Sequence, residues 1–313
     1  MFNKLRRMMI GVSVIALLAG CAGKGVKFEI NSADNSSRQL WELAQAQQNV
    51  SVPVNQLPEM TSDEFEVLGD GLLNQGKPAL AYVQYEKALK VEPGNIRIEY
   101  KQGIVFLVVG KCEDAISQFN RVVKKDPKFD LAYEGLGRVH FQLKDYANAE
   151  ANFRKAVELN HKLWLSYNYL GSIYDFKQDY EQAILEYTSA LSVRNDQGFI
   201  YNNLGVSCLL AGHYQAAVDS FSKAIEKNFR ESRVSNNMAL AMANLGRYDD
   251  ALDAFKSGGG EAHAYNNMGC VYLEKRKYED AIRCFEKAIS IEPSFYAKAN
   301  DNLKKAKMLA AKQ

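Results

Sequence analysis

The sequence has little proline, little cysteine and no excess of one charge. Six prolines and five cysteines occur in 313 residues, which excludes a proline-rich linker protein and a disulfide-built scaffold. Lys and Arg number 39 against 37 Asp and Glu, so the chain lacks the general electrostatic signature of nucleic-acid binding. The apolar content of 47% excludes a wholly disordered chain.

Long hydrophobic runs are also lacking, apart from one at the start. Lys4, Arg6 and Arg7 precede an apolar stretch that extends from Met8 to Leu18. A transmembrane helix needs about 20 apolar residues, and this stretch is shorter. The pattern of a basic segment followed by a short apolar core predicts a signal peptide over residues 1–20. A polytopic membrane protein is excluded.

The end of this segment, Leu18-Ala19-Gly20-Cys21, resembles the lipobox of bacterial lipoproteins. The resemblance implies that the chain is cut before Cys21, which becomes a lipidated N-terminus. Two or three acyl chains would anchor the protein permanently to a membrane, because each buried CH₂ contributes about 0.8 kcal/mol. The residue after Cys21 is Ala22 and not aspartate. In lipoproteins of hosts with two membranes, this implies that the protein is exported to the outer membrane and faces the periplasm. The alternative is a signal peptide with an incidental cysteine.

Residues 21–61 have the composition of a tether, rich in Gly, Ser and Asn over 23–25 and 31–37. The pattern of the segment from Arg38 to Gln48 predicts a short helix whose apolar residues are Leu40, Trp41 and Leu43. Pro53 and Pro58 interrupt regular structure after it. Trp41 is expected either to contact the folded region or to act as an anchor for a partner.

From Ser62 the sequence repeats, with units that start at residues 62, 96, 130, 164, 198, 232 and 262. The spacing is 34 residues, except for the last, which is 30. Three positions of each unit keep their chemistry: a small residue at position 8, alanine at position 20 and an aromatic residue at position 24. The alanines are Ala81, Ala115, Ala149, Ala183, Ala217, Ala251 and Ala281. The aromatic residues are Tyr85, Phe119, Phe153, Tyr187, Phe221, Phe255 and Phe285.

A period of 34 residues with this pattern resembles the tetratricopeptide repeat. The resemblance implies an all-α fold: a right-handed solenoid of seven helix-turn-helix repeats over residues 62–293, closed by a capping helix over 294–313. Small residues at positions 8 and 20 let the two helices of a repeat approach, and the aromatic side chain fills the space between repeats. Burial of each aromatic ring contributes roughly 1.5–3 kcal/mol, and the stacking of neighbouring repeats stabilises the whole array.

The predicted capping helix carries Leu303, Ala306 and Leu309 on one side and several lysines on the rest of its surface. This pattern is typical of a solubilising cap. The alternative is a tail that binds a membrane or an acidic partner.

The sixth repeat is four residues shorter than the others and ends in Gly258-Gly259-Gly260. Because glycine costs about 1 kcal/mol per residue inside a helix, we expect the second helix of this repeat to end before the glycines. The deletion then produces either a fixed bend or a hinge before the seventh repeat.

Asparagine is concentrated in the first helices of the later repeats, at positions 5 and 6. In proteins with this type of repeat the first helices line the concave face, with positions 2, 5, 6, 9, 12 and 13 pointing into it. One Asn side chain can bond both the donor and the acceptor of a peptide unit, so a stack of them can hold an extended chain. The alternative is that these asparagines only support packing. The predicted peptide-binding groove consists of Asn168, Phe199, Asn202, Asn203, Val206, Leu209, Asn236, Asn237, Leu240, Asn266, Asn267, Cys270 and Leu273.

Signals of catalysis are lacking. His140, His161, His213 and His263 fall at four different repeat positions, and no known metal, nucleophile or phosphate-loop motif occurs. We therefore expect a non-enzymatic protein with no catalytic residue, metal or cofactor. The other four cysteines are expected to be free thiols, with a Cys270–Cys284 bridge as the alternative.

A lipobox joined to this repeat array is similar to three bacterial groups: the TadD-like lipoproteins of Flp (Tad) pilus assembly, the PilF/PilW pilotins, and NlpI-like adaptors of cell-wall enzymes. The segment from Ser232 to Tyr248 resembles the RVRxNLALALALxGRY segment of the TadD-like group. This resemblance implies a lipid-anchored scaffold that assembles a pilus or secretion apparatus and binds a secretin or pilus component. The alternatives are an adaptor for peptidoglycan enzymes and a pilotin. The sequence has no clear signal for or against a homodimer.

Overall fold

A computed structural model describes residues 60–292 and 296–312. Every regular element in these two ranges is a helix, fifteen in all, which confirms the all-α fold class. The predicted signal peptide, Cys21, the tether and the predicted helix over 38–48 lie outside the described residues.

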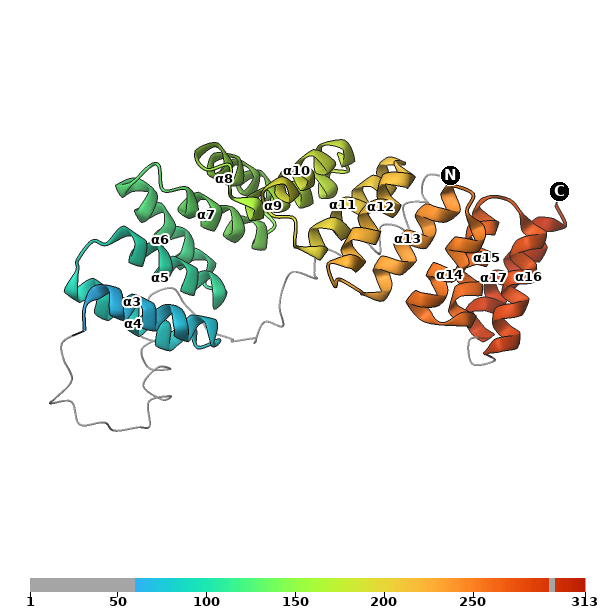
Figure 1. The fold of residues 1–313 in the computed structure, drawn as a ribbon, viewed down its shortest axis with the longest axis horizontal. Coiled ribbons are helices and arrows are strands. Elements are labelled where there is room, and N and C mark those ends of the chain that lie inside the picture. Colours follow the sequence, from blue (N-terminus) through green and yellow to red (C-terminus); the bar gives the residue numbers. More distant parts are fainter. Residues whose placement is uncertain (1–59, 293–295, 313) are drawn as a thin grey trace, which may run out of the picture. The chain divides into compact units, whose positions relative to one another are not determined.

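The chain divides into two compact units, with the boundary after His161. Figure 1 shows the described helices of both units, coloured along the sequence. Unit 1 contains three helical hairpins: α3 (Ser62–Asn74) with α4 (Pro78–Val91), α5 (Ile96–Val108) with α6 (Cys112–Lys125), and α7 (Asp130–Gln142) with α8 (Tyr146–Leu159).

Unit 2 contains four further hairpins and a single final helix. The hairpins are α9 (Trp164–Lys177) with α10 (Tyr180–Val193), α11 (Gly198–Ala211) with α12 (Tyr214–Glu226), α13 (Ser232–Asn244) with α14 (Tyr248–Gly259), and α15 (Glu261–Glu274) with α16 (Tyr278–Ile291). The final helix is α17 (Tyr296–Ala310). The first helices of the seven hairpins begin at, or within one residue of, the starts that the repeat period indicates.

The core of each hairpin is an aromatic ring that lies on the position-8 residue of the same repeat. A Cβ added to Gly103 would lie 2.6 Å from the ring of Phe119. The same ring also meets the next hairpin, because a Cβ on Gly135 would lie 2.6 Å from it. The rings at position 24 are fully or almost fully buried in all seven repeats. Glycine at position 8 therefore allows the close approach on which the buried rings depend.

The turn inside each hairpin places one residue in the left-handed region of backbone space. Four repeats use glycine there, as at Gly76 and Gly212. The other three use Lys144, Gln178 and Arg276, with φ between 59° and 63°. A left-handed residue directly after a helix satisfies its last carbonyl groups, so the turn is kept even where glycine is absent.

The sixth repeat corrects one expectation. Helix α14 continues through Gly258 and Gly259, and Gly260 is the single residue between α14 and α15. Gly260 has φ 83° and ψ 174°, a conformation that is essentially restricted to glycine. A Cβ on Gly258 would lie 2.6 Å from Asn236 Oδ1 of α13. The prediction that the helix ends before the glycines is wrong, because close packing of α14 on α13 outweighs the low helix propensity of glycine.

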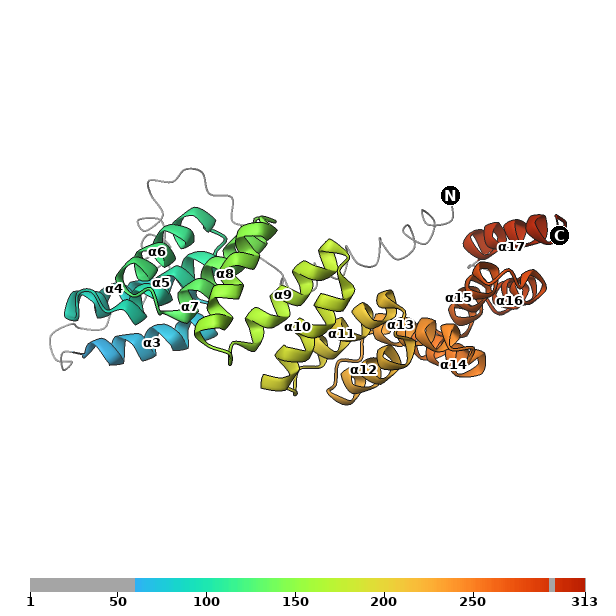
Figure 2. The same cartoon turned by 90° about the horizontal axis from the view of Figure 1, so that it is seen from above.

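Helix α17 closes the C-terminal end of unit 2. Leu303 packs against a buried cluster formed by Ala281, Phe285 and Ala306, and Figure 2 shows α17 beyond α15 and α16. The lysines at 304, 305 and 307 remain exposed. The arrangement confirms a capping helix after the seventh hairpin.

Candidate peptide-binding face

The first helices of unit 2 have rows of side chains at positions 2, 6, 9 and 13 that are mostly partly exposed or exposed. Because residues three and four apart lie on the same side of a helix, each row runs along one face. We name as the first-helix face of unit 2 the following residues from α9, α11, α13 and α15: Tyr169, Phe176, Phe199, Asn203, Leu210, Arg233, Asn237, Leu240, Asn244, His263 and Asn267.

The asparagines at position 6 and those at position 5 have different surroundings. Asn203, Asn237 and Asn267, at position 6, are partly exposed. At position 5, Asn202 is 1% exposed and Asn266 is 0% exposed. Adjacent residues on a helix point about 100° apart. The neighbouring helices cover the side chains of Asn202 and Asn266 at position 5 and leave those at position 6 partly exposed.

The structure therefore corrects part of the predicted groove. Asn168, Asn202 and Asn266 are buried, and so is Val206 at position 9. The prediction that these four side chains point into an open groove is wrong. Asn236, also at position 5, is only partly buried.

The buried asparagines link one repeat to the next. Asn203 Nδ2 donates to Asn168 Oδ1 at 3.3 Å. In the same way, Asn302 Nδ2 of α17 donates to Asn266 Oδ1 at 3.1 Å. The capping helix thus makes, with its own asparagine, a contact with α15 like the one that α11 makes with α9. These hydrogen bonds hold the asparagine side chains in one orientation.

Three asparagine atoms in this region are buried without a hydrogen-bond partner among the described residues: Asn202 Oδ1, Asn236 Oδ1 and Asn266 Nδ2. An unsatisfied buried polar atom costs about 1–3 kcal/mol. Such a cost is more often tolerated at functional sites than in ordinary cores.

Apolar side chains flank the exposed asparagines. Phe199, Leu209 and Leu240 are partly exposed on α11 and α13. Cys270 and Leu273, which were predicted to line the same groove, pack against the cluster that also contains Leu303 of α17. Both side chains nevertheless remain partly exposed, like those on α11 and α13, so the first-helix face continues onto α15.

Comparison with known proteins places the repeats in a family. Family models described as tetratricopeptide repeat match residues 100–161, 166–197, 211–258 and 262–295, which together make up more than half of the chain. The chain belongs to the tetratricopeptide-repeat family. Proteins built from these repeats typically serve as scaffolds for protein–protein interaction.

Individual relatives cover only parts of known proteins. The chain is 36% identical over 67 residues to an FK506-binding protein-like protein of Mus musculus, covering 21% of this chain and 19% of that one. It is 28% identical over 79 residues to Superkiller complex protein 3 of Homo sapiens, covering 25% of this chain and 5% of that one. The matched segment therefore spans a fifth or less of these curated relatives.

Two solved structures share the fold over more of the chain. YrrB, described as a TPR protein with an unusual peptide-binding site, is 24% identical with a TM-score of 0.50, and the match covers 59% of this chain and 97% of YrrB. The APC/C hetero-tetramer Cut9–Hcn1 is 21% identical with a TM-score of 0.51, and the match covers 86% of this chain and 52% of that one. At these identities the likeness shows a shared fold.

A carboxylate on α9 of the tetratricopeptide array lies at the edge of the first-helix face. Ser207 Oγ donates to Asp175 Oδ1 at 2.7 Å, and Tyr187 Oη donates to Asp175 Oδ2 at 2.8 Å. Burial raises the pKa of Asp175 to about 6, although both hydrogen bonds act in the opposite direction. The sequence analysis missed this group. Tyr187, a tyrosine where most repeats have phenylalanine, was the available signal, because a buried hydroxyl needs a partner.

The first helices of unit 1 carry charges instead of asparagines. Arg97 Nε donates to Glu66 Oε2 at 2.8 Å, and Arg97 Nη2 donates to Asp63 Oδ1 at 2.7 Å. Lys101 Nζ lies 2.5 Å from both Glu66 Oε1 and Asp70 Oδ2. The acidic residues that the sequence places at this end are therefore neutralised by ion pairs from the second repeat.

The four cysteines at 112, 208, 270 and 284 are free thiols. Burial raises the pKa of the Cys208 thiol to about 11 and that of the Cys284 thiol to about 11, so both remain protonated and unreactive at neutral pH. Within residues 60–292 and 296–312, no cluster of His, Cys, Asp and Glu is suited to hold a metal ion. None of the helices in these ranges is both long and apolar enough to cross a membrane.

Proposed function

We propose that the first-helix face of unit 2 binds an extended peptide of a protein partner. The observation that carries the proposal is the register of Asn203, Asn237 and Asn267: one partly exposed amide per repeat, at the same helical position. Each amide can donate to a peptide carbonyl and accept from a peptide N–H. Successive asparagines thus hold the backbone of a ligand whatever its side chains are.

The side chains of these asparagines form few and long hydrogen bonds within the protein, so they can bond to a peptide instead. Asn203 has partners only at 3.3 and 3.4 Å, near the upper limit for a hydrogen bond. Asn267 lies 3.1 Å from the ring of His263. No described residue forms a hydrogen bond with the Asn237 side chain. A peptide that offers shorter hydrogen bonds to these side chains gains binding free energy relative to such long contacts.

The surroundings supply the remaining affinity and some specificity. Phe199, Leu210 and Leu240 offer apolar surface to alternate side chains of the peptide, and buried apolar area contributes about 25 cal/mol per Å². Arg233 and His263, at position 2 of their helices, are polar side chains on the same face. A ligand with apolar residues at every second position matches this arrangement.

We further propose that the protein is a lipid-anchored assembly factor of a Tad/Flp-type pilus or secretion apparatus, located at the outer membrane and facing the periplasm. The lipobox that ends at Cys21 and the segment from Ser232 to Tyr248 support this proposal. If the protein and its partner are anchored to the same membrane, the local concentration of the partner near the protein is raised, and binding becomes nearly intramolecular. A secretin or pilus component is the expected partner.

A crosslinking pull-down with the lipidated protein as bait, performed on solubilised envelopes, tests the assignment. Recovery of a secretin or pilus component supports the assembly factor. Recovery of cell-wall hydrolases instead favours an adaptor for peptidoglycan enzymes, which would use the same face for a different client.

The purified partner then tests the face itself. The triple variant Asn203→Ala, Asn237→Ala, Asn267→Ala is expected to weaken binding about 30- to 300-fold, since each lost hydrogen-bond pair costs about 1 kcal/mol. The matched control replaces three asparagines of other surfaces by alanine: Asn120, Asn152 and Asn195. Equal affinity of the triple variant and the wild type, with unchanged helix content, would exclude the asparagine ladder.

A further inference from the structure

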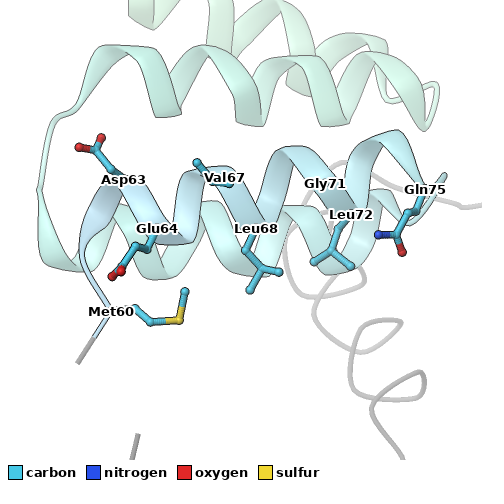
Figure 3. Close-up of a pocket in the computed structure, with 8 residues that line it drawn as sticks. All are labelled: Met60, Asp63, Glu64, Val67, Leu68, Gly71, Leu72 and Gln75. Carbon is cyan, nitrogen blue, oxygen red and sulfur yellow. The ribbon is translucent and has the colours of Figure 1, made fainter. Parts of the chain in front are cut away.

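The outer side of α3 carries an apolar depression with no partner among the described residues. Eight residues line this space of about 550 Å³, among them Met60, Leu68, Gly71 and Leu72, and Figure 3 shows them along one side of the helix. Val67 is 70% exposed and Leu68 is 43% exposed. An apolar strip of this kind on a helix is suited to bind another helix.

The corresponding side of the other first helices in unit 1 is buried. Glu64, Leu68 and Gly71 occupy positions 3, 7 and 10 of the first repeat. The same positions in α5 are Ile98, Gln102 and Val105, which are at most 3% exposed, and in α7 all three are buried as well.

The second helix of the preceding repeat contributes to this burial. Gln102 Nε2 of α5 donates to Glu86 Oε1 of α4 at 2.7 Å, and the rings of Tyr82 and Phe106 lie 5.4 Å apart. The exposed side of α3 is therefore the side on which a preceding helix would pack.

Gly71 is a second, independent sign that a helix approaches this side. Most glycines inside the described helices lie so close to a neighbouring atom that a side chain would clash, but a Cβ on Gly71 would meet nothing within 4 Å. Gly71 also has no left-handed backbone that would require glycine. A glycine in a helix interior costs about 1 kcal/mol relative to alanine. Nothing within the described fold offsets this cost, whereas a helix docked over Gly71 would use the space that the missing side chain leaves.

The segment over residues 38–48 has the pattern that such a site requires. On a helix, Leu40, Trp41, Leu43 and Ala44 would lie on one side, with Arg38 and Glu42 on the other. Its length is close to that of α3, which has 13 residues.

The spacer between this segment and α3 is long enough for docking. Residues 49–59 number eleven and can span up to about 36 Å, whereas α3 is about 20 Å long. A short tether of this kind gives an effective concentration in the millimolar range, above the concentration that a second copy of the protein would reach in solution. The covalently attached segment is therefore the favoured occupant.

We propose that residues 38–48 dock as a helix on the outer side of α3, over Leu68 and Gly71, in the place that the second helix of a preceding repeat would take. The docked segment caps the N-terminal end of the array, as α17 caps the other end. It also covers the apolar strip through which two copies would otherwise associate. This proposal is independent of peptide binding at unit 2.

The fluorescence of Trp41 in the purified full chain tests the proposal. The sequence contains only two tryptophans, so Trp164→Phe leaves Trp41 as the single reporter. Phenylalanine keeps an aromatic ring in the cluster that Trp164 joins. We expect a blue-shifted emission and at least threefold protection from acrylamide quenching, compared with the same protein in denaturant.

Gly71→Glu is the decisive variant. The open space at Gly71 accepts a side chain, and glutamate raises helix propensity, so α3 is expected to fold at least as well as before. A charge at the centre of the strip should nevertheless displace Trp41, with a red shift and loss of protection. Leu68→Asp should have the same effect, whereas the control Leu185→Glu, at an exposed site on α10, should leave the signal unchanged.

Other outcomes would overturn the proposal. A Trp41 signal typical of free solvent in the parent protein excludes docking. A protected signal that neither Gly71→Glu nor Leu68→Asp changes assigns the protection to detergent or to another surface. Protection that increases with protein concentration, together with a dimer in analytical ultracentrifugation, assigns the strip to a second copy.

Discussion

Units 1 and 2 are built from the same repeat, but their first helices present different chemistry. In unit 1 the exposed positions carry Asp63, Arg97 and Lys101, which form ion pairs with one another or with Glu66. In unit 2 the corresponding region carries asparagines and apolar side chains. The positions that hold the scaffold together, 8, 20 and 24, hardly differ between the units. The comparison shows that the positions that stabilise the scaffold are separate from the first-helix positions at which the two units differ, so that the face can vary while the fold remains.

The largest expected effect tests the shared scaffold. Phe119→Ala in unit 1 and Phe221→Ala in unit 2 each remove a fully buried ring and should lower the local free energy of unfolding by about 3–5 kcal/mol. Since repeat arrays need not unfold in one step, hydrogen exchange of the helices in each unit is the appropriate measurement. Leu185→Ala, at an exposed site, should change little. A large loss in only one unit would show that the two scaffolds are not equivalent.

An intermediate effect concerns Asp175 of unit 2. Because its pKa is about 6 in the folded protein and about 3.9 in an unfolded chain, the folded state holds a proton that the unfolded state has released between these values. The free energy of unfolding should therefore fall as pH rises from about 4 to about 7, by on the order of 2–3 kcal/mol from this group.

Asp175→Asn should remove this dependence, as measured by chemical denaturation across that pH range. Asp219→Asn, an exposed aspartate on α12, is the control and should keep the wild-type slope. A slope that persists in Asp175→Asn would assign the pH dependence to another group.

The smallest expected effect concerns the ion pairs of unit 1, and it distinguishes the charged first helices of unit 1 from the asparagine-bearing ones of unit 2. Arg97→Ala removes two ion pairs of a side chain that is itself about half exposed, so the loss should be about 0.5–1 kcal/mol at low salt and smaller at high salt. The triple asparagine variant of unit 2 should show no such salt dependence in its unfolding. Thermal denaturation at two salt concentrations distinguishes the two responses, and an equal salt effect on both variants would contradict the assignment.

The scaffold was largely predictable because its determinants are local and periodic. The repeat starts, the alanines at position 20 and the buried rings follow from a spacing of 34 residues. The helical state of Gly258 and Gly259 was not predictable from propensity, since it depends on the close approach of α14 to Asn236 of α13. The hydrogen bonds of Asp175 were equally hidden, because Ser207 lies in the next repeat.

At the candidate site, too, the sequence predicted some features of single residues and missed others. The sequence identified asparagine at position 5 of four repeats, but not that three of these four side chains, those of Asn168, Asn202 and Asn266, are buried. It also placed Val206 in an open groove, whereas the structure buries it. In each case the missing information concerned a neighbouring helix.

The sequence by itself determined the all-α repeat architecture, since a pattern of small and aromatic residues with a constant period can bury its apolar surface only by stacking identical hairpins. The tertiary structure alone decided which asparagines reach the surface and how the Asp175 carboxylate is surrounded by Ser207 and Tyr187. The physical reason is that exposure is set by what packs on a helix from outside. Two adjacent residues of identical type therefore acquire different roles according to the helices that surround them.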